Sequence, residues 1–282
     1  MNLQEGISIL EINKIFSNST LKREYLNLLS HHIEIDLNGL RVRDLDNKII
    51  ETWSYNISKQ VIRELFVDSE KYLKNRDAGD KIEALMVEWC DLGLGEFDWP
   101  FQPKMFDEHV HSINRRLLTE IEKDNIVAND AIRYRRIKDI NARRNDYIEF
   151  LIFANNDNVI PTFRNARGVD FYIDGQSFDQ KVSRSVGRNF INEYGENYRQ
   201  IAIQNPELVA KCLYEYQDEE RFGYEPRLLV VYLDSDLELE DIEASIAEAD
   251  LTNPTNIEFE YLHSNGQTAT YGTYCYVILL HR

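Results

Sequence analysis

The chain has 282 residues, of which 49 are Asp or Glu and 32 are Lys or Arg, so its formal net charge is −17. This length is enough for one large domain or two small ones, each with a real hydrophobic core. No segment approaches about 18 uninterrupted apolar residues, and the amino terminus lacks a basic stretch followed by an apolar one. The sequence therefore argues against a membrane protein, and we expect a cytoplasmic one.

The first 130 residues are predicted to be mainly helical. Apolar residues recur at three- and four-residue spacing near 47–74, 80–91 and 107–125, which is typical of amphipathic helices. Alternating residues around Asn38-Gly39 predict one early hairpin over 33–43, because Asn-Gly favours a two-residue turn.

From residue 131 onward the pattern changes to alternating helices and strands. A helix is expected near 130–154, followed by an extended segment at 159–161 and a hairpin over 169–182. Helical residues near 190–217, a buried strand at 228–233, an acidic helix at 237–249 and a closing hairpin over 257–280 complete the chain. This order predicts an α/β (α+β) fold with a mixed sheet covered by helices. The predicted division is a helical region at 1–130 and an α/β core at 131–282.

The hairpin over 169–182 carries the most informative side chains. Asp174-Gly175 is a preferred type I′ turn, and with these two residues at its centre Asp170 lies directly opposite Asp179. Lys181 shares their face because side chains alternate along a strand. The other face is expected to pack into the core through its apolar residues, which are Val169, Phe171, Ile173, Phe178 and Val182.

Two facing carboxylates repel each other unless a cation lies between them. Mg²⁺ prefers oxygen ligands and commonly uses one or two carboxylates plus waters. A bound Mg²⁺ supplies what phosphodiester hydrolysis needs, namely charge neutralisation and an activated water, and a nearby lysine can stabilise the developing charge. Asp170 and Asp179 are therefore the predicted metal ligands, with Lys181 as the assisting amine. The alternative is a polar sheet face on which Lys181 simply bridges two aspartates.

This arrangement resembles the PD-(D/E)xK nuclease superfamily, which includes most type II restriction endonucleases. The resemblance covers residues 138–234 and implies a restriction-endonuclease-like sheet flanked by helices, with Mg²⁺ on Asp170 and Asp179. It also implies a further carboxylate from the preceding helix, for which Glu149 is the first candidate and Asp146 the second. The chain departs from the family pattern in three places: Val169 replaces the motif's proline, the second acid is Asp instead of Glu, and Gln180 occupies an apolar position.

A second acid-x-Lys triplet, Asp46-Asn47-Lys48, lies at a predicted turn or helix start and has no facing carboxylate. We interpret it as a coincidence. An acid-x-Lys triplet is therefore informative only together with the hairpin register.

The basic residues are concentrated around the hairpin. Residues 133–199 hold twelve Lys or Arg and nine Asp or Glu, a local balance of +3, which leaves −20 for the rest of the chain. A solvated basic helix face would explain the basic residues that precede the hairpin, but clustering beside the predicted metal site favours contacts with DNA phosphates. The predicted DNA contacts are Arg143, Arg144, Arg164, Arg167, Ser183, Arg184 and Arg188.

The function that we expect is that of a Mg²⁺-dependent endonuclease on double-stranded DNA. The resemblance implies a sequence-specific type II restriction enzyme of a restriction–modification system, acting as a homodimer, with residues 1–130 shared between dimerisation and DNA recognition. The alternatives are a structure-specific or phage-defence nuclease and a noncatalytic nucleic-acid-binding or complex subunit with the same fold.

Overall fold

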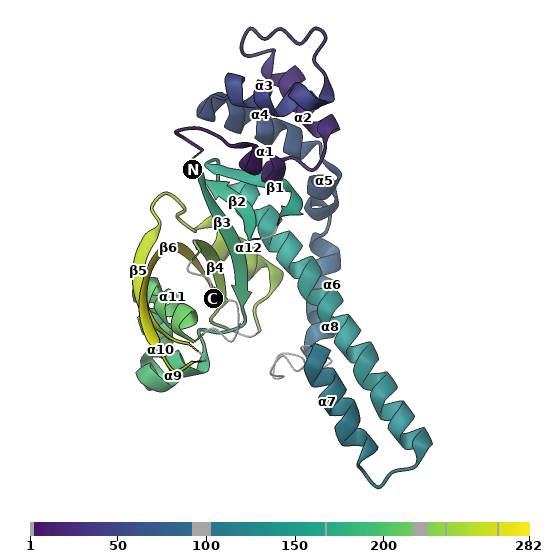
Figure 1. The fold of residues 1–282 in the computed structure, drawn as a ribbon. Coiled ribbons are helices and arrows are strands. Elements are labelled where there is room, and N and C mark those ends of the chain that lie inside the picture. The colour runs from purple at the N-terminus through teal and green to yellow at the C-terminus, as the bar shows by residue number, and fades with distance from the viewer. Residues whose placement is uncertain (1–2, 92–102, 167, 217–224, 235, 264) are drawn as a thin grey trace. The chain divides into compact units, whose positions relative to one another are not determined.

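The computed structural model describes residues 3–91, 103–166, 168–216, 225–234, 236–263 and 265–282 (Figure 1). Within these residues the protein is a mixed α/β structure with a six-stranded sheet. The predicted mixed sheet with flanking helices is confirmed. The more specific prediction, a restriction-endonuclease-like arrangement, stays a prediction.

The chain separates into two compact units. One contains Met1–Asp77 together with Glu149–Arg282, and the other is Ala78–Ile148. The smaller unit is helical and contains α6 (Gly79–Asp91), α7 (Pro103–Asn114) and most of α8 (Glu120–Asn155). The predicted boundary at residue 130 separates two regions partly by their expected roles, and it stays a prediction. The amino-terminal helices up to Asp77 belong to the same unit as the sheet.

The sheet of the larger unit has the strand order β1-β2-β3-β4-β6-β5. Its strands are β1 (Val159–Ala166), β2 (Val169–Ile173), β3 (Gln176–Ser183), β4 (Arg227–Tyr232), β5 (Thr255–Leu262) and β6 (Thr268–Leu280). Strands β3, β4 and β6 run parallel, whereas the β1–β2, β2–β3 and β5–β6 pairs are antiparallel. Parallel neighbours require a crossover, and the helices between β3 and β4 provide one.

The β2–β3 hairpin forms in the predicted register. Phe171 pairs with Phe178, and Ile173 pairs with Gln176. The turn residues Asp174 and Gly175 both have positive φ, 47° and 82°, as a type I′ turn requires. Phe171 and Phe178 are almost completely buried, so the apolar face packs into the core as predicted.

The predicted helical stretch at 47–74 consists of three helices. They are α3 (Leu45–Thr52), α4 (Tyr55–Val67) and α5 (Glu70–Arg76). The Ser69 hydroxyl accepts a hydrogen bond from the backbone N–H of Tyr72 and so begins α5 as a separate helix. The periodic pattern runs through the breaks because all three helices bury one apolar side.

The predicted hairpin over 33–43 is wrong. A turn forms at 38–39, where Gly39 has a φ of 69°, but the flanking residues are not in strands. Ile33, Ile35, Leu37 and Leu40 pack against the core formed by the amino-terminal helices. Burial of these side chains against helices thus overrides the local preference for strand pairing.

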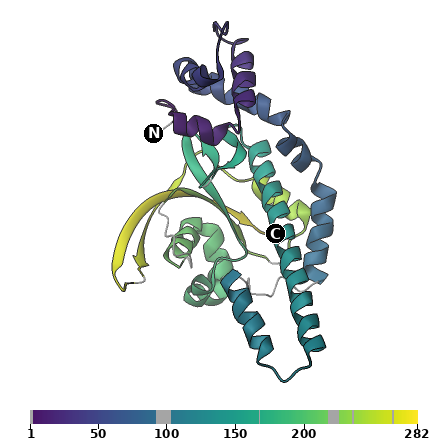
Figure 2. The ribbon, with the colours of Figure 1, turned by 45° about the vertical axis from the view of Figure 1, so that its right-hand side comes forward.

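Helices α1 (Ile9–Ile15), α2 (Ser19–Leu29), α3 and α4 gather at the end of the sheet that carries β1 and β2 (Figure 1 and Figure 2). Their buried residues form one cluster with Ile160, Val169 and Tyr172 of the sheet. The amino-terminal helices and the strand bearing Asp170 therefore share a core.

The predicted helix at 190–217 is likewise divided, into α9 (Arg188–Tyr194), α10 (Tyr198–Gln204) and α11 (Pro206–Glu215). Pro206 begins α11 at a position where its missing N–H costs nothing. These helices form a second core cluster with Leu229, Val231 and Phe259.

The acidic helix α12 (Leu239–Ala247) packs against β6. Among the helices that the structure describes, none has the length and apolar character to cross a membrane.

Candidate metal and phosphate site

Asp170 and Asp179 come together where β2 and β3 lie side by side. The β2–β3 pairs end at Phe171–Phe178, and extending this register by one residue places Asp170 opposite Asp179. The charge of Asp179 acts on the Asp170 carboxyl, as expected for neighbouring side chains. One Asp170 carboxylate oxygen, Oδ2, accepts a hydrogen bond of 2.7 Å from the backbone N–H of Gln180. This bond fixes the carboxylate at the hairpin and leaves its other oxygen for a further ligand.

Lys181 is the exposed member of the site. Its ammonium nitrogen lies 3.1 Å from Oδ2 of Asp179. The Lys181 side chain is 43% exposed, whereas that of Asp179 is 17% exposed. The lysine therefore offsets the charge of one of the two carboxylates.

The pKa of Asp170 is raised. Burial is the largest cause, and the negative charge of Asp179 adds to it, while the Gln180 N–H, Lys71 and Lys181 act in the opposite direction. The ionised form of Asp170 is thus held at a cost in free energy. A divalent cation between the two aspartates would remove that cost.

Lys71 is a site residue that the sequence analysis missed. Its ammonium lies 2.5 Å from Oε1 of Glu149 and 3.3 Å from the carbonyl oxygen of Thr162. Both side chains of the ion pair are mostly buried, at 23% and 14% exposed. No sequence signal could have found Lys71, because it comes from the first turn of α5 and meets Glu149 only through tertiary packing.

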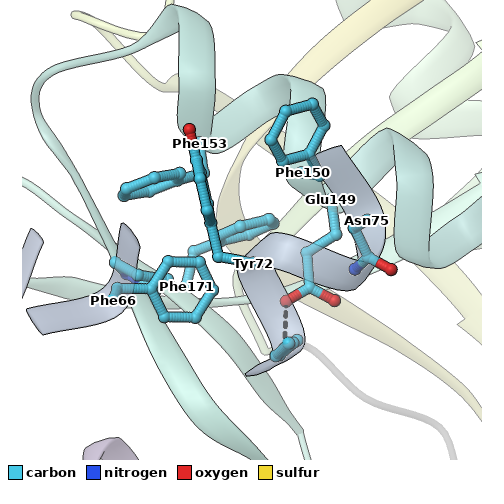
Figure 3. A pocket seen from close by; sticks show the side chains of 9 residues that line it. Phe66, Tyr72, Asn75, Glu149, Phe150, Phe153 and Phe171 are labelled. Carbon is cyan, nitrogen blue, oxygen red and sulfur yellow. Dashed lines mark hydrogen bonds and ion pairs between the residues drawn. The ribbon is translucent and has the colours of Figure 1, made fainter. Parts of the chain in front are cut away.

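Lys71 and Glu149 line a small pocket with aromatic walls. Its empty volume is about 220 Å³, counting the part open to solvent. Figure 3 shows Glu149 extending beside Phe150 and Asn75, with a dashed line marking the ion pair. The pocket is lined by Phe66, Lys71, Tyr72, Asn75, Glu149, Phe150, Phe153, Pro161 and Phe171.

The position of Glu149 is fixed by the end of α8. The Arg63 guanidinium donates hydrogen bonds to the carbonyl oxygens of Asn156 and Val159 at 2.9 and 2.7 Å, and it lies over the Phe153 ring. Asn156 directly follows the last residue of α8, and Val159 begins β1. Arg63 therefore anchors the last turns of α8, which carry Glu149, to α4.

Arg227 is a second basic residue that the sequence analysis did not select. It begins β4 and is the register partner of Asp179, so both side chains leave the same face of the sheet. Its guanidinium carbon lies 5.2 Å from the centre of the Tyr214 ring. The start of the predicted strand at 228–233 was the available signal, since Arg227 directly precedes that strand.

The other predicted site residues are not tested by the structure. Ser183 donates a hydrogen bond of 2.7 Å to the carbonyl oxygen of Ser185, and Arg188 is an exposed residue that begins α9. Arg164 lies in β1 but its side chain is outside the described residues, and Arg167 is wholly outside them. Arg143, Arg144 and Asp146 belong to the smaller unit. All of these remain predictions, as does the Asp146 alternative to Glu149.

The donor set at the hairpin fits Mg²⁺. Asp170 and Asp179 offer oxygen ligands from facing strands, and Mg²⁺ usually keeps several waters, so two carboxylates are enough. Within the described part of the chain, no group of three or more His, Cys, Asp or Glu side chains is arranged to hold a metal ion. Glu149 is therefore not gathered with the two aspartates as a third ligand.

Comparison of the chain with protein-family models, with curated proteins and with solved structures finds no match. The assignment of a function therefore depends on the site itself.

Proposed function

We propose that this protein is a Mg²⁺-dependent endonuclease that hydrolyses phosphodiester bonds of double-stranded DNA. The observation that carries the proposal is the convergence of Asp170, Asp179 and Lys181 on one face of the β2–β3 hairpin. We further propose that it is a type II restriction enzyme acting as a homodimer in the cytoplasm. These finer points are supported by the resemblance of the motif alone.

Each residue has a distinct role in the proposed reaction. Asp170 and Asp179 would hold the metal ion, and Mg²⁺ when bound supplies charge neutralisation and a more acidic water. The Lys181 ammonium, exposed at the edge of the site, is placed to donate a hydrogen bond to a non-bridging phosphate oxygen and to orient the attacking water. Arg227 is placed to contact a neighbouring phosphate from β4.

The ion pairs of the site favour one competing function. Asp179 is already paired with Lys181 and Glu149 with Lys71, so the acidic side chains have internal cations. A noncatalytic DNA-binding or complex subunit would need no bound metal ion, because these lysines already balance the carboxylates. Only an assay of cleavage separates this alternative from the nuclease.

Plasmid cleavage with and without Mg²⁺ tests the proposal. We expect discrete metal-dependent products from the wild type, and a loss of rate of roughly 10²-fold or more in Asp179→Asn and Lys181→Ala, because one removes a ligand and the other a charge-stabilising donor. Lys48→Ala is the matched control, since it alters the other acid-x-Lys triplet at the start of α3, and it should cut like the wild type. Intact plasmid under all conditions would favour the noncatalytic subunit, whereas cutting of branched DNA alone would favour a structure-specific nuclease.

A further inference from the structure

The Lys71–Glu149 pair joins two segments that lie 78 residues apart in the chain. Ser69 sets the start of α5, which fixes Lys71 in its first turn, and Arg63 anchors the end of α8, which fixes Glu149. Both partners are held by elements of the same compact unit. The pair is therefore a built feature of the site and not a chance contact of two mobile surface side chains.

The Lys71 ammonium has two oxygen partners inside an aromatic pocket. They are Oε1 of Glu149 and the Thr162 carbonyl oxygen. Thr162 in turn donates a hydrogen bond from its hydroxyl to the carbonyl oxygen of Asp170. Lys71, from α5, thus contacts β1, the neighbour of the strand that bears the first proposed metal ligand.

The positive charge of Lys71 also acts on Asp170, where it partly opposes the rise in pKa that burial causes. An ammonium and a divalent cation are attracted by the same negative potential and repel each other, and the repulsion is strong where side chains are largely buried. A lysine at this position makes binding of a metal ion less favourable. It also holds the Glu149 carboxylate in an ion pair, and in this structure that carboxylate is not gathered with the two aspartates.

We propose that Lys71 is a positioning residue that competes with the divalent ion for Glu149, so that the site binds its metal through Asp170 and Asp179 and with reduced affinity. The inference depends on the proposed metal-dependent function and deepens it, since it identifies what sets metal affinity at the same site. Removing the ammonium releases Glu149 toward the metal and removes a repulsive charge. Both effects tighten binding of the ion.

Calorimetric titration of the full-length protein with Ca²⁺, in the absence of DNA, tests the proposal without measuring activity. Lys71→Met keeps an apolar stem among the aromatic rings and removes the charge. We expect it to bind Ca²⁺ roughly tenfold more tightly than the wild type, within the range by which residues behind the metal ligands alter metal affinity. Lys71→Arg preserves the charge and should retain wild-type affinity.

The double variant Lys71→Met/Glu149→Gln assigns the effect to Glu149. It has the same formal charge as the wild type, and we expect its Ca²⁺ affinity to return close to the wild-type value. Lys74→Met, which removes an exposed lysine from the same helix, controls for general charge and should not change the affinity. An affinity of Lys71→Met equal to or weaker than the wild type would overturn the proposal, as would a gain that survives in the double variant or appears equally in Lys74→Met.

If circular dichroism shows that Lys71→Met does not fold, Glu149→Gln decides the question. This variant removes the carboxylate that balances the charge of the Lys71 ammonium, so the proposed competition predicts weaker Ca²⁺ binding than in the wild type. An unchanged Ca²⁺ affinity contradicts the proposal.

Failure of this inference is distinguishable from failure of the proposed function. Mg²⁺-dependent cleavage with no effect of Lys71 refutes the inference alone, whereas tighter Ca²⁺ binding by Lys71→Met in a protein that never cuts DNA refutes the nuclease alone. A protein that binds no Ca²⁺ in any variant and does not cut DNA with Mg²⁺ refutes both.

Discussion

Asp170 lies in an environment that differs from that of a surface carboxylate. It is enclosed at the hairpin, faces Asp179, and is only partly compensated by the Gln180 N–H and two lysines. A group whose pKa is raised by folding contributes stability that is complete below the unfolded pKa and is lost as pH rises through the folded pKa. Ionised Asp170 therefore destabilises the metal-free protein at neutral pH.

Asp170→Asn tests this cost. The asparagine carbonyl oxygen can still accept the Gln180 hydrogen bond but carries no charge. We expect the variant to melt about 2 to 4 °C higher than the metal-free wild type at pH 7.5, the shift that about 1 kcal/mol produces in a domain of 150–250 residues. Below the ordinary aspartate pKa, near 3.9, the difference should disappear, because the wild-type side chain is then protonated in both states.

Thermal melts at both pH values, followed by circular dichroism, provide the measurement. Asp124→Asn, which removes an exposed carboxylate from α8, is the control and should leave the melting temperature nearly unchanged. A stabilisation by Asp170→Asn that persists at low pH would show that better packing or hydrogen bonding of the asparagine, and not removal of charge, explains the effect.

At the scale of elements, the β2–β3 hairpin determines which side chains meet. A two-residue turn sets the register, and a shift by one residue would move Asp179 and Lys181 to the opposite face. The turn depends on Gly175, whose φ of 82° is unfavourable for any residue with a side chain, whereas Asp174 at 47° is of a type that tolerates this region. The carbonyl oxygen of Gly175 also accepts a hydrogen bond of 2.8 Å from Leu3, which joins the turn to the amino terminus.

Gly175→Ala and Asp174→Asn form a matched pair at this turn. The alanine must adopt a left-handed conformation, and we expect it to lower the free energy of unfolding by about 1 to 2 kcal/mol. The asparagine suits a type I′ turn and should change stability by less than about 0.5 kcal/mol. Urea denaturation gives both values, and an alanine variant as stable as the wild type would contradict the requirement for glycine.

The sequence predicted this hairpin because its determinants are local. Asp-Gly sets the turn, alternation sets the faces, and both lie within fourteen residues, 169–182. The same reasoning was wrong at 33–43, where Asn38-Gly39 makes a turn but the flanking apolar residues pack on helices. Turn chemistry is local, whereas strand pairing also depends on what the apolar side chains can be buried against.

At the scale of the whole molecule, the distribution of charge determines how an acidic protein could bind DNA. The net charge of −17 disfavours nonspecific association with a polyanion, but residues 133–199 have a local balance of +3. Phosphate contacts make affinity fall with salt, with a slope of roughly −0.9 for each phosphate neutralised. The predicted contact residues can therefore be tested one by one.

Arg188→Ala should weaken binding to duplex DNA and make the salt slope about one unit less negative, because an exposed arginine at the start of α9 would be lost from the phosphate contacts. Arg43→Ala, which removes another exposed arginine from the amino-terminal helices, is the control and should leave the slope unchanged. Fluorescence anisotropy of labelled duplex DNA in Ca²⁺ at several salt concentrations measures both. Equal slopes for Arg188→Ala and the wild type would remove Arg188 from the interface.

The sequence by itself determined the mixed α/β class, the order of most helices and strands, and the facing pair Asp170 and Asp179 with Lys181 beside them. These features follow from periodicity and turn chemistry, which act over a few residues. Only the tertiary structure brought Lys71 to Glu149 and Arg227 beside Asp179, because those pairs join segments separated by tens of residues and depend on how helices pack on the sheet. Tertiary packing also decided that Glu149, chosen by resemblance as a third carboxylate, has a lysine as its counter-ion.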